Sequence, residues 1–175
     1  MKKIYLLIYY LFAQYLPMQP FPGFNLFYKF RYFLCKKILF QCGENVIVKN
    51  KCYIGDGSKL KVGSNSQLGQ NARLGGPITL GDFVMMGPDV VIMGVTHDIS
   101  DITKPMIDPS NPSLEKPVLI GDNVWIGTRV IIMPGVTIGG NSIVGAGAVV
   151  TKSFGPNSII GGVPAKFIKH REYVS

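Results

Sequence analysis

The stretch from Val62 to Ile92 reads VGSNSQLGQNARLGGPITLGDFVMMGPDVVI and repeats one pattern every six residues. A large aliphatic residue occupies every sixth position, and a glycine follows each of the first five. These aliphatic positions are Val62, Leu68, Leu74, Leu80, Met86 and Ile92. A period of six matches neither the 3.6-residue repeat of a helix nor the two-residue alternation of an amphipathic strand.

The same pattern returns later in the chain and has a rougher copy before this stretch. After an interruption it continues through Ile120, Ile126, Ile132, Ile138, Val144 and Val150. Small or β-branched residues recur four places after the aliphatic ones, as at Ala72 and Val130. The earlier copy begins at Val48 and Ile54, and a slip of two residues separates it from Val62. Chance does not keep such a register over so many repeats.

This period is typical of a solenoid built from short strands that meet at tight corners. Three six-residue sides make one coil, with the aliphatic side chains inside and small residues at the corners. Positions 62 and 80, three repeats apart, then lie one above the other at a spacing of about 4.8 Å. The sequence therefore predicts a mainly β fold, a parallel β-helix over residues 44–163.

The charge of the chain is concentrated at its N-terminus. The net charge is +8, and residues 1–43 hold six Lys or Arg and no Asp or Glu. A basic, aromatic segment suits an anionic membrane surface or an acidic partner. Nucleic acid is not expected as a partner, because no recognition motif accompanies the charge.

The N-terminal segment 1–43 is predicted to be helical. Helical spacing of apolar residues predicts a helix over 4–15 and a second one over roughly 25–40, with the prolines of PMQPFPG between them. Two roles fit this segment, a cap over the end of the β-helix and a membrane-facing surface, and the two are compatible. No small-x-small cleavage site follows the first apolar run, and the three cysteines form no CxxC pair. We therefore expect a cytoplasmic protein, peripheral to the inner face of the cytoplasmic membrane if the segment binds lipid.

The repeat is interrupted between residues 94 and 117. This polar segment contains several prolines, so we expect an irregular loop, and long loops within compact domains often carry function. His97 lies where the loop leaves the repeat, which makes it the candidate catalytic residue, and Asp89 and Asp98 are close in sequence. The other histidine, His170, lies in the tail over 164–175 and is expected to be solvated.

The motifs around this loop resemble those of one enzyme family. GPDVVIMGVTHDIS (87–100) and KPVLIGDNVWIGTRVIIMPGVTIGGNSIVGAGAVVTKSFGPNSIIGGVPAKFIK (116–169) are similar to the hexapeptide-repeat O-acetyltransferases of galactosides, maltose and exopolysaccharides. The N-terminus and the HD pair look most like the colanic-acid and lipopolysaccharide type. The resemblance implies a left-handed β-helix, His97 as general base and Trp125 beside the active site. Asp89 stands where the family often has an acceptor-contacting asparagine, so Asp89 binds the acceptor or orients His97, and Asp98 is the other candidate for these roles.

The resemblance also implies acetyl-CoA as co-substrate, no required metal, and a homotrimer whose active sites lie between subunits. The residues it places along acetyl-CoA are Gly127, Thr128, Gly145, Ala146, Thr151, Lys152, Lys166 and Lys169. A zinc-dependent β-helix enzyme of the γ-carbonic anhydrase type is not expected, because it needs three histidines and this chain has two.

The function expected from these observations is acetyl transfer from acetyl-CoA to a sugar hydroxyl, in surface polysaccharide biosynthesis. Alternative acceptors are a free sugar, a xenobiotic alcohol or serine, although serine acetyltransferases carry a larger helical N-terminal domain. A non-catalytic β-helix scaffold is a further alternative, and His97 and the NVWIG motif argue against it. The sequence leaves open the acceptor sugar, its hydroxyl and the range of acyl groups.

Overall fold

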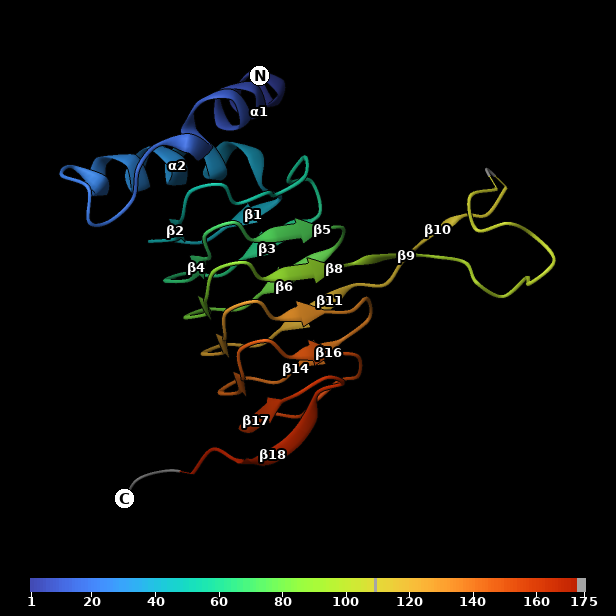
Figure 1. Ribbon diagram of the computed structural model, residues 1–175. Coiled ribbons are helices and arrows are strands. Elements are labelled where there is room, and N and C mark those ends of the chain that lie inside the picture. Colours follow the sequence, from blue (N-terminus) through green and yellow to red (C-terminus); the bar gives the residue numbers. More distant parts are fainter. Residues whose placement is uncertain (109, 173–175) are drawn as a thin grey trace.

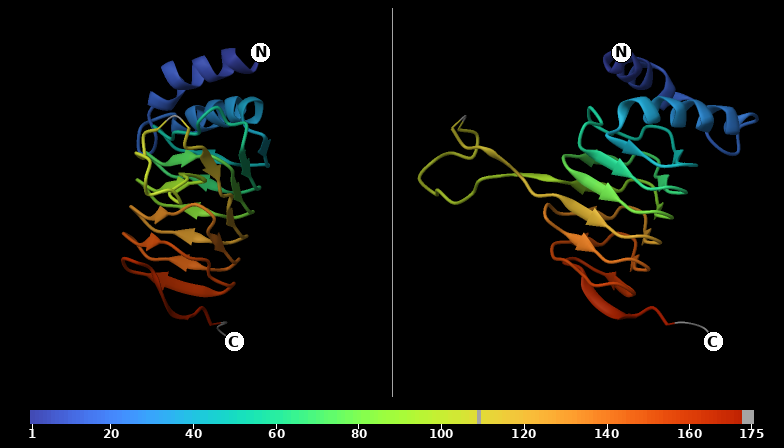
Figure 2. Two further views of the ribbon diagram at one scale, coloured as in Figure 1. Left: turned by 90° about the vertical axis from the view of Figure 1, so that its right-hand side faces the viewer. Right: turned by 180° about the vertical axis from the view of Figure 1, so that it is seen from behind.

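The computed structural model describes residues 1–108 and 110–172 and consists of a stack of flat coils with three appendages. Figure 1 shows two helices across one end of the stack, a long ribbon that leaves its side, and the C-terminal strand at the opposite end. Two further views show the same separation of the helices from the C-terminal strand (Figure 2).

The sides of the stack are three sheets of short, mostly parallel strands. The seven-stranded sheet contains β2 (Ile47–Val48), β4 (Gln67–Leu68), β7 (Met85–Met86), β12 (Trp125–Ile126), β15 (Ile143–Val144), β17 (Ser158–Gly161) and β18 (Lys166–His170). The five-stranded sheet contains β1 (Gln41–Cys42), β3 (Leu60–Val62), β6 (Ile78–Leu80), β11 (Val118–Ile120) and β14 (Thr137–Ile138). The four-stranded sheet contains β5 (Arg73–Gly75), β8 (Val91–Met93), β13 (Ile131–Ile132) and β16 (Val149–Val150).

The strand register confirms a coil of three repeats. Val62 pairs with Leu80, and Ile126 pairs with Val144, so in both cases the partner is the aliphatic residue three repeats later. Across the interruption, Leu80 pairs with Ile120 instead of with position 98, so the chain in excess of one coil loops out there. The aliphatic side chains therefore stack in columns along the axis.

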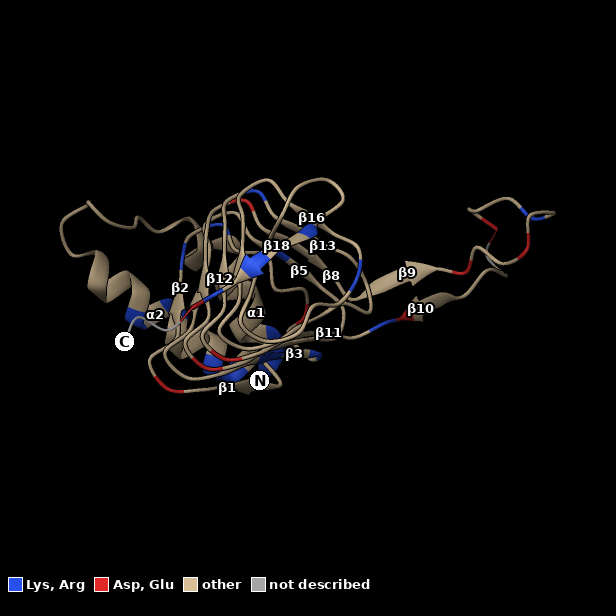
Figure 3. Cartoon of the chain, turned by 90° about the horizontal axis from the view of Figure 1, so that it is seen from below, with Lys and Arg blue, Asp and Glu red and all other residues tan. Residues whose placement is uncertain are grey.

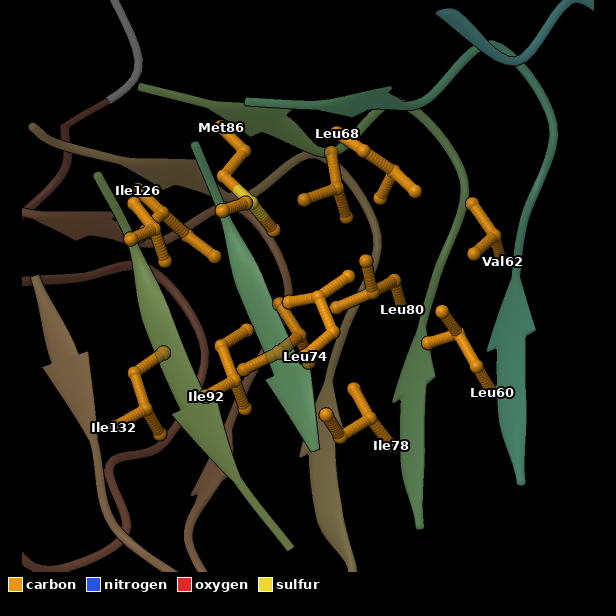
Figure 4. Packing of buried hydrophobic residues seen from close by; sticks show 14 of the residues in the cluster. Leu60, Val62, Leu68, Leu74, Ile78, Leu80, Met86, Ile92, Ile126 and Ile132 are labelled. Atoms are coloured by element: carbon orange, nitrogen blue, oxygen red, sulfur yellow. The ribbon is translucent and has the colours of Figure 1, made fainter. Parts of the chain in front are cut away.

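The columns form the core. All the aliphatic positions of the two regular runs are buried, and none is more than 2% exposed. Figure 4 shows Leu68, Met86 and Ile126 pointing inward from successive coils. A side chain of this size stabilises the fold by about 1.5–3 kcal/mol when it is fully buried.

Most corners contain a residue in the left-handed conformation, three places after the aliphatic residue. In the two regular runs, most of these residues are asparagine or aspartate, which tolerate this backbone better than other L-residues. In the two regular runs, the corner residues with positive φ at this place are Asn65, Asn71, Phe83, Asp89, Asn123, Arg129, Asn141 and the glycines Gly135 and Gly147. The Asn123 amide also donates to the Asn141 side chain at 2.9 Å, which links one coil to the next.

The helical segment covers the first coils. The structure has α1 (Lys2–Leu11), the 3₁₀ turn η1 (Ala13–Tyr15) and α2 (Phe24–Ile38) where the sequence predicts helices over 4–15 and 25–40. The chain joins the five-stranded sheet at β1, within the segment assigned to the helical part. The predicted tail is also partly regular, because β18 pairs antiparallel with β17. Residues 173–175 of that tail lie outside the described residues.

Arg31 ties the helical segment to the β-helix. The side chain of Arg31 is fully buried in α2, and its guanidinium donates to backbone carbonyls of Val48 (2.7 Å), Leu16 (2.9 Å) and Ala13 (3.2 Å). Burial lowers the pKa of Arg31, and no carboxylate within the described residues forms a salt bridge with it. One cation thus satisfies carbonyls from separate segments of the chain.

We predict that Arg31→Met lowers the free energy of unfolding by about 3 kcal/mol, because it leaves several buried carbonyls without a donor. Urea unfolding followed by circular dichroism measures the change. Lys29→Met, an exposed position on the same helix, is the control and should change stability by less than about 0.5 kcal/mol. Equal stabilities of the two variants would contradict the role given to Arg31.

At the corners, Asn123→Val should cost about 2 kcal/mol, because a β-branched residue is strained at the φ of 55° found there and cannot replace the amide hydrogen bond. Asn123→Gly relieves the backbone and loses only the hydrogen bond, so its cost should be about half as large. The same unfolding measurement tests both variants, and a valine variant as stable as the glycine variant would show that the corner carries no strain.

Candidate active site

His97 lies at the outer end of a two-stranded ribbon. The ribbon consists of β9 (Val95–His97) and β10 (Ser113–Glu115), which pair antiparallel with His97 opposite Ser113. It continues β8 outward and returns to β11, so both of its ends are held by strands of the β-helix (Figure 2). The expectation of an irregular loop over 94–117 is thus wrong at its base, because Pro105, Pro112 and Pro117 lie outside the two strands and leave their backbone free to pair.

Two contacts hold the base of the ribbon. Glu115 on β10 forms an ion pair with Lys59 of an earlier coil. The amide of Gly94 donates to the carbonyl of Gly75 at 2.6 Å, and a Cβ at Gly94 would lie 2.6 Å from the carbonyl oxygen of Pro77. Because residue 94 has no side chain, the chain can leave the stack in close contact with Pro77 of the neighbouring coil. Sequence reasoning missed the Lys59–Glu115 pair, because 56 residues separate its members.

The imidazole of His97 is exposed and available. Within residues 1–108 and 110–172, no group forms a hydrogen bond with its ring nitrogens. A neutral imidazole in this state can accept a proton from a bound hydroxyl group.

The hydrogen bonds of Asp98 are made within the ribbon and its loop. Its carboxylate accepts the backbone N–H of Ser100 at 2.9 Å, and hydrogen bonds from Ser100 lower the pKa of Asp98 below its usual value. The backbone N–H of Asp98 donates to the carbonyl of Pro112 at 3.2 Å. Asp98 therefore closes the turn that follows His97.

Asp89 lies at the other end of β8 from His97. The extended chain from Asp89 to Met93 spans about 13 Å, and His97 is farther out. Asp89 has φ 57°, and its carboxylate accepts the side-chain amide of Asn71 at 3.0 Å. Within one protomer Asp89 thus belongs to a corner and is too distant to orient the imidazole.

Two edges of the stack flank the four-stranded sheet. We call the edge where the ribbon leaves the ribbon edge; it contains residues 76–77, 94, 133–135 and 151–153. We call the other the amide edge; it contains residues 69–71, 87–89, 127–129 and 145–147. Of the predicted site residues, Thr151 and Lys152 lie at the ribbon edge, from which the ribbon carries His97 outward. The amide edge contains Asp89, Gly127, Thr128, Gly145 and Ala146.

The amide edge presents unpaired backbone donors. The amides of Thr128 and Ala146 donate no hydrogen bond within the described residues, and both residues are exposed. Close coil contacts surround them: a Cβ at Gly87 would lie 2.8 Å from the nitrogen of Thr128, and one at Gly127 would lie 2.6 Å from the nitrogen of Ala146. Such fixed donors suit a carbonyl, an oxyanion or the amides of a pantetheine chain.

Trp125 belongs to a third surface, the outer face of the seven-stranded sheet. It is 48% exposed and lies in register with Met85, which is also 48% exposed, and with Ile143. Phe83, 58% exposed, adds to this apolar surface from the preceding corner. An exposed apolar surface of this kind favours contact with another protein surface or a ligand.

The predicted phosphate-binding lysines are dispersed. Lys152 lies over the ring of Phe154 at the ribbon edge, with 5.7 Å between its ammonium and the ring centroid. On β18, Lys166 pairs with Gly161 and Lys169 with Ile159, at the C-terminal end of the stack. Figure 3, viewed from that end, shows basic residues on β18 and around the coils. Within the described residues no group of three His, Cys, Asp or Glu could hold a metal ion.

Comparisons of the sequence identify relatives. The bacterial transferase hexapeptide repeat (six repeats) matches residues 117–152. A galactoside O-acetyltransferase from Escherichia coli strain K12 is 34% identical over 166 residues, which cover 88% of this chain and 80% of that protein. Such identity over most of both chains establishes common descent.

Solved structures agree. A maltose O-acetyltransferase from Clostridium difficile 630 has a TM-score of 0.81 and 31% identity, covering 98% of this chain and 87% of its own. A hexapeptide-repeat acetyltransferase from Vibrio cholerae O1 biovar eltor, solved with acetyl coenzyme A, has a TM-score of 0.73 and 29% identity, with coverages of 82% and 77%. The chain therefore belongs to the hexapeptide-repeat acetyltransferases, left-handed β-helix enzymes of the galactoside and maltose O-acetyltransferase type.

Proposed function

We propose that this enzyme transfers the acetyl group of acetyl-CoA to a saccharide hydroxyl, with His97 as the general base, in surface polysaccharide biosynthesis. The proposal rests on two features of the described part of the chain. The imidazole of His97 on the ribbon is exposed and forms no hydrogen bond, and the amides of Thr128 and Ala146 on the amide edge donate none. The acetyl coenzyme A bound to the Vibrio cholerae relative supports the donor.

The chemistry assigns a role to each group. The imidazole of His97 accepts the proton of the acceptor hydroxyl as its oxygen attacks the thioester carbonyl. The carbonyl oxygen becomes an oxyanion, which a backbone amide such as that of Thr128 stabilises. The intermediate then collapses with loss of the coenzyme A thiolate, and the imidazolium returns the proton to that sulfur. The products are the acetylated sugar and free coenzyme A, and no step needs a metal ion.

We propose that the active sites form between subunits of a homotrimer. The ribbon edge and the amide edge lie on either side of the four-stranded sheet, so one protomer cannot bring both groups to one substrate. A cyclic arrangement places the ribbon edge of one copy against the amide edge or the Trp125 face of the next. The exposed apolar surface around Trp125 supports such a contact.

For the acceptor, we favour a sugar because two of the relatives are O-acetyltransferases of galactosides and of maltose. We also propose that the enzyme is of the colanic-acid type and that its acceptor sugar is linked to a lipid. Purified enzyme incubated with acetyl-CoA and a panel of free, nucleotide-activated and lipid-linked sugars tests it, with release of free thiol as the readout. Thiol release with serine or a xenobiotic alcohol alone would replace the saccharide assignment.

We predict that His97→Ala lowers kcat about 10²–10⁴-fold while the KM for acetyl-CoA changes little, because the base contacts the acceptor hydroxyl and not the coenzyme. Steady-state thiol release with the best sugar of the panel measures both constants. His170→Ala removes the other histidine, which packs on Phe167 in β18, and should leave kcat unchanged. A His97→Ala enzyme with wild-type kcat would exclude His97 as the base.

Sites shared between subunits can be tested by complementation. His97→Ala and Ala146→Trp each inactivate the homotrimer, the second by filling the space in front of the amide edge. Co-expressed subunits that mix at random should recover about a quarter of wild-type activity, because each mixed trimer has one site with both edges intact. Activity no higher than that of the separate variants would place both groups in one protomer.

A further inference from the structure

The outer face of α1 is apolar and uncovered. Ile4, Leu7 and Leu11 are 61%, 58% and 70% exposed, and Ile8 lies beside them on the same face of the helix. Tyr15, 60% exposed, continues this spacing into the 3₁₀ turn. We call these five residues the α1 stripe.

The opposite face of α1 fixes the orientation of the helix. The hydroxyl of Tyr9 is buried and donates to the carbonyl of Cys52 at 2.7 Å. The hydroxyl of Tyr10 donates to the carbonyl of Gly55 at the same distance. Rotation of the helix to bury the stripe would break both hydrogen bonds, so the stripe faces outward by construction.

The stripe lies at the outermost end of the molecule. Figures 1 and 2 show α1 stacked on the far side of α2, at the end of the stack opposite β18. No other element of the described chain covers it in these views. A flat partner can therefore approach α1 without meeting the ribbon or the coils.

The helical segment that carries the stripe is basic. Residues 1–43 contain no acidic residue. Of the six basic residues of this segment, Arg31 is buried, Lys36 pairs with Glu44, and Lys2 is half-buried near Asp56. Lys3, Lys29 and Lys37 are exposed. Lys3 flanks the stripe on α1 itself. The segment therefore combines an apolar surface with an unbalanced positive charge.

We propose that the α1 stripe docks on the surface of an anionic lipid bilayer, with the helix parallel to the membrane plane. Apolar side chains of one helical face enter the headgroup boundary, while lysines contact anionic headgroups. No helix within the described residues is long and apolar enough to span a bilayer, so the contact is peripheral. A second copy of this chain is a poorer partner, because it would bring two basic segments together.

The experiment is co-sedimentation of the full chain with vesicles. Vesicles of about 70% phosphatidylcholine and 30% phosphatidylglycerol should bind the protein at least about tenfold more strongly than vesicles of phosphatidylcholine alone, and salt should reduce the difference. Binding that is absent with both vesicle types would overturn the proposal. The measurement does not depend on acetyl transfer, so it stands apart from the proposed reaction.

The variant that tests the stripe is Ile4→Ser/Leu7→Ser/Leu11→Ser, whose positions are exposed, so the fold is retained. Binding to anionic vesicles should fall at least about tenfold, and acetylation of a soluble sugar should be unchanged. The matched control, Ile102→Ser/Ile107→Ser, removes two isoleucines that are 93% and 92% exposed on the loop and should bind vesicles like the wild type.

Two outcomes would contradict the assignment. Equal loss of vesicle binding in both variants would show a general effect of exposed apolar residues. A stripe variant that lowers the mass of the protein in light scattering, with unchanged vesicle binding, would identify the stripe as a contact between copies of this chain.

Discussion

The constraint on which this structure depends is the stacking of identical side-chain positions at the spacing of hydrogen-bonded strands. Parallel pairing of Val62 with Leu80 and of Ile126 with Val144 requires each coil to return to its starting point after three repeats. Three corners per coil are the consequence, and inward aliphatic residues must follow each other every six positions. The corners in turn require backbone that few residues adopt, which explains the asparagines at positive φ.

This constraint explains what the sequence could predict. Side-chain columns are periodic, so the coil length, the inward residues and the interruption at 94–117 can be read directly from the spacing. The ribbon strands could not be read in this way, because Val95–His97 pairs with a segment separated by a loop and carries no repeat of its own. The role of Arg31 was also hidden, since its acceptors are backbone carbonyls that any sequence provides.

The candidate site was predicted as a set of residues but not as an arrangement. Motif resemblance gave His97, Asp89, Thr128 and Ala146, and the short distance in sequence between Asp89 and His97 favoured a carboxylate that orients the imidazole. The structure separates Asp89 from His97 instead, because β8 lies between them and β9 carries His97 outward from the stack. Asp89 lies at a corner where its carboxylate accepts a hydrogen bond from Asn71. This contact explains an acidic residue at that corner without a role in catalysis. Residues one coil apart are the true neighbours, as Asp89 and Arg129 are along the amide edge.

A symmetric trimer would serve both surfaces proposed for this protein, the active site between subunits and the membrane contact of α1. In a cyclic trimer whose axis follows the stack, each ribbon meets a neighbour, and all three α1 helices lie at the same end. Three weak membrane contacts then act together, which raises the overall affinity well above that of one helix. The ribbon leaves the four-stranded side two coils beyond Tyr53, about 10 Å along the axis from the coil nearest the helices. On the proposed membrane surface, α2 and α1 also lie between the first coil and the bilayer and add about 10 Å each. An acceptor whose lipid carrier stays in the bilayer would therefore need a saccharide long enough to pass both helices and two coils before it reaches His97.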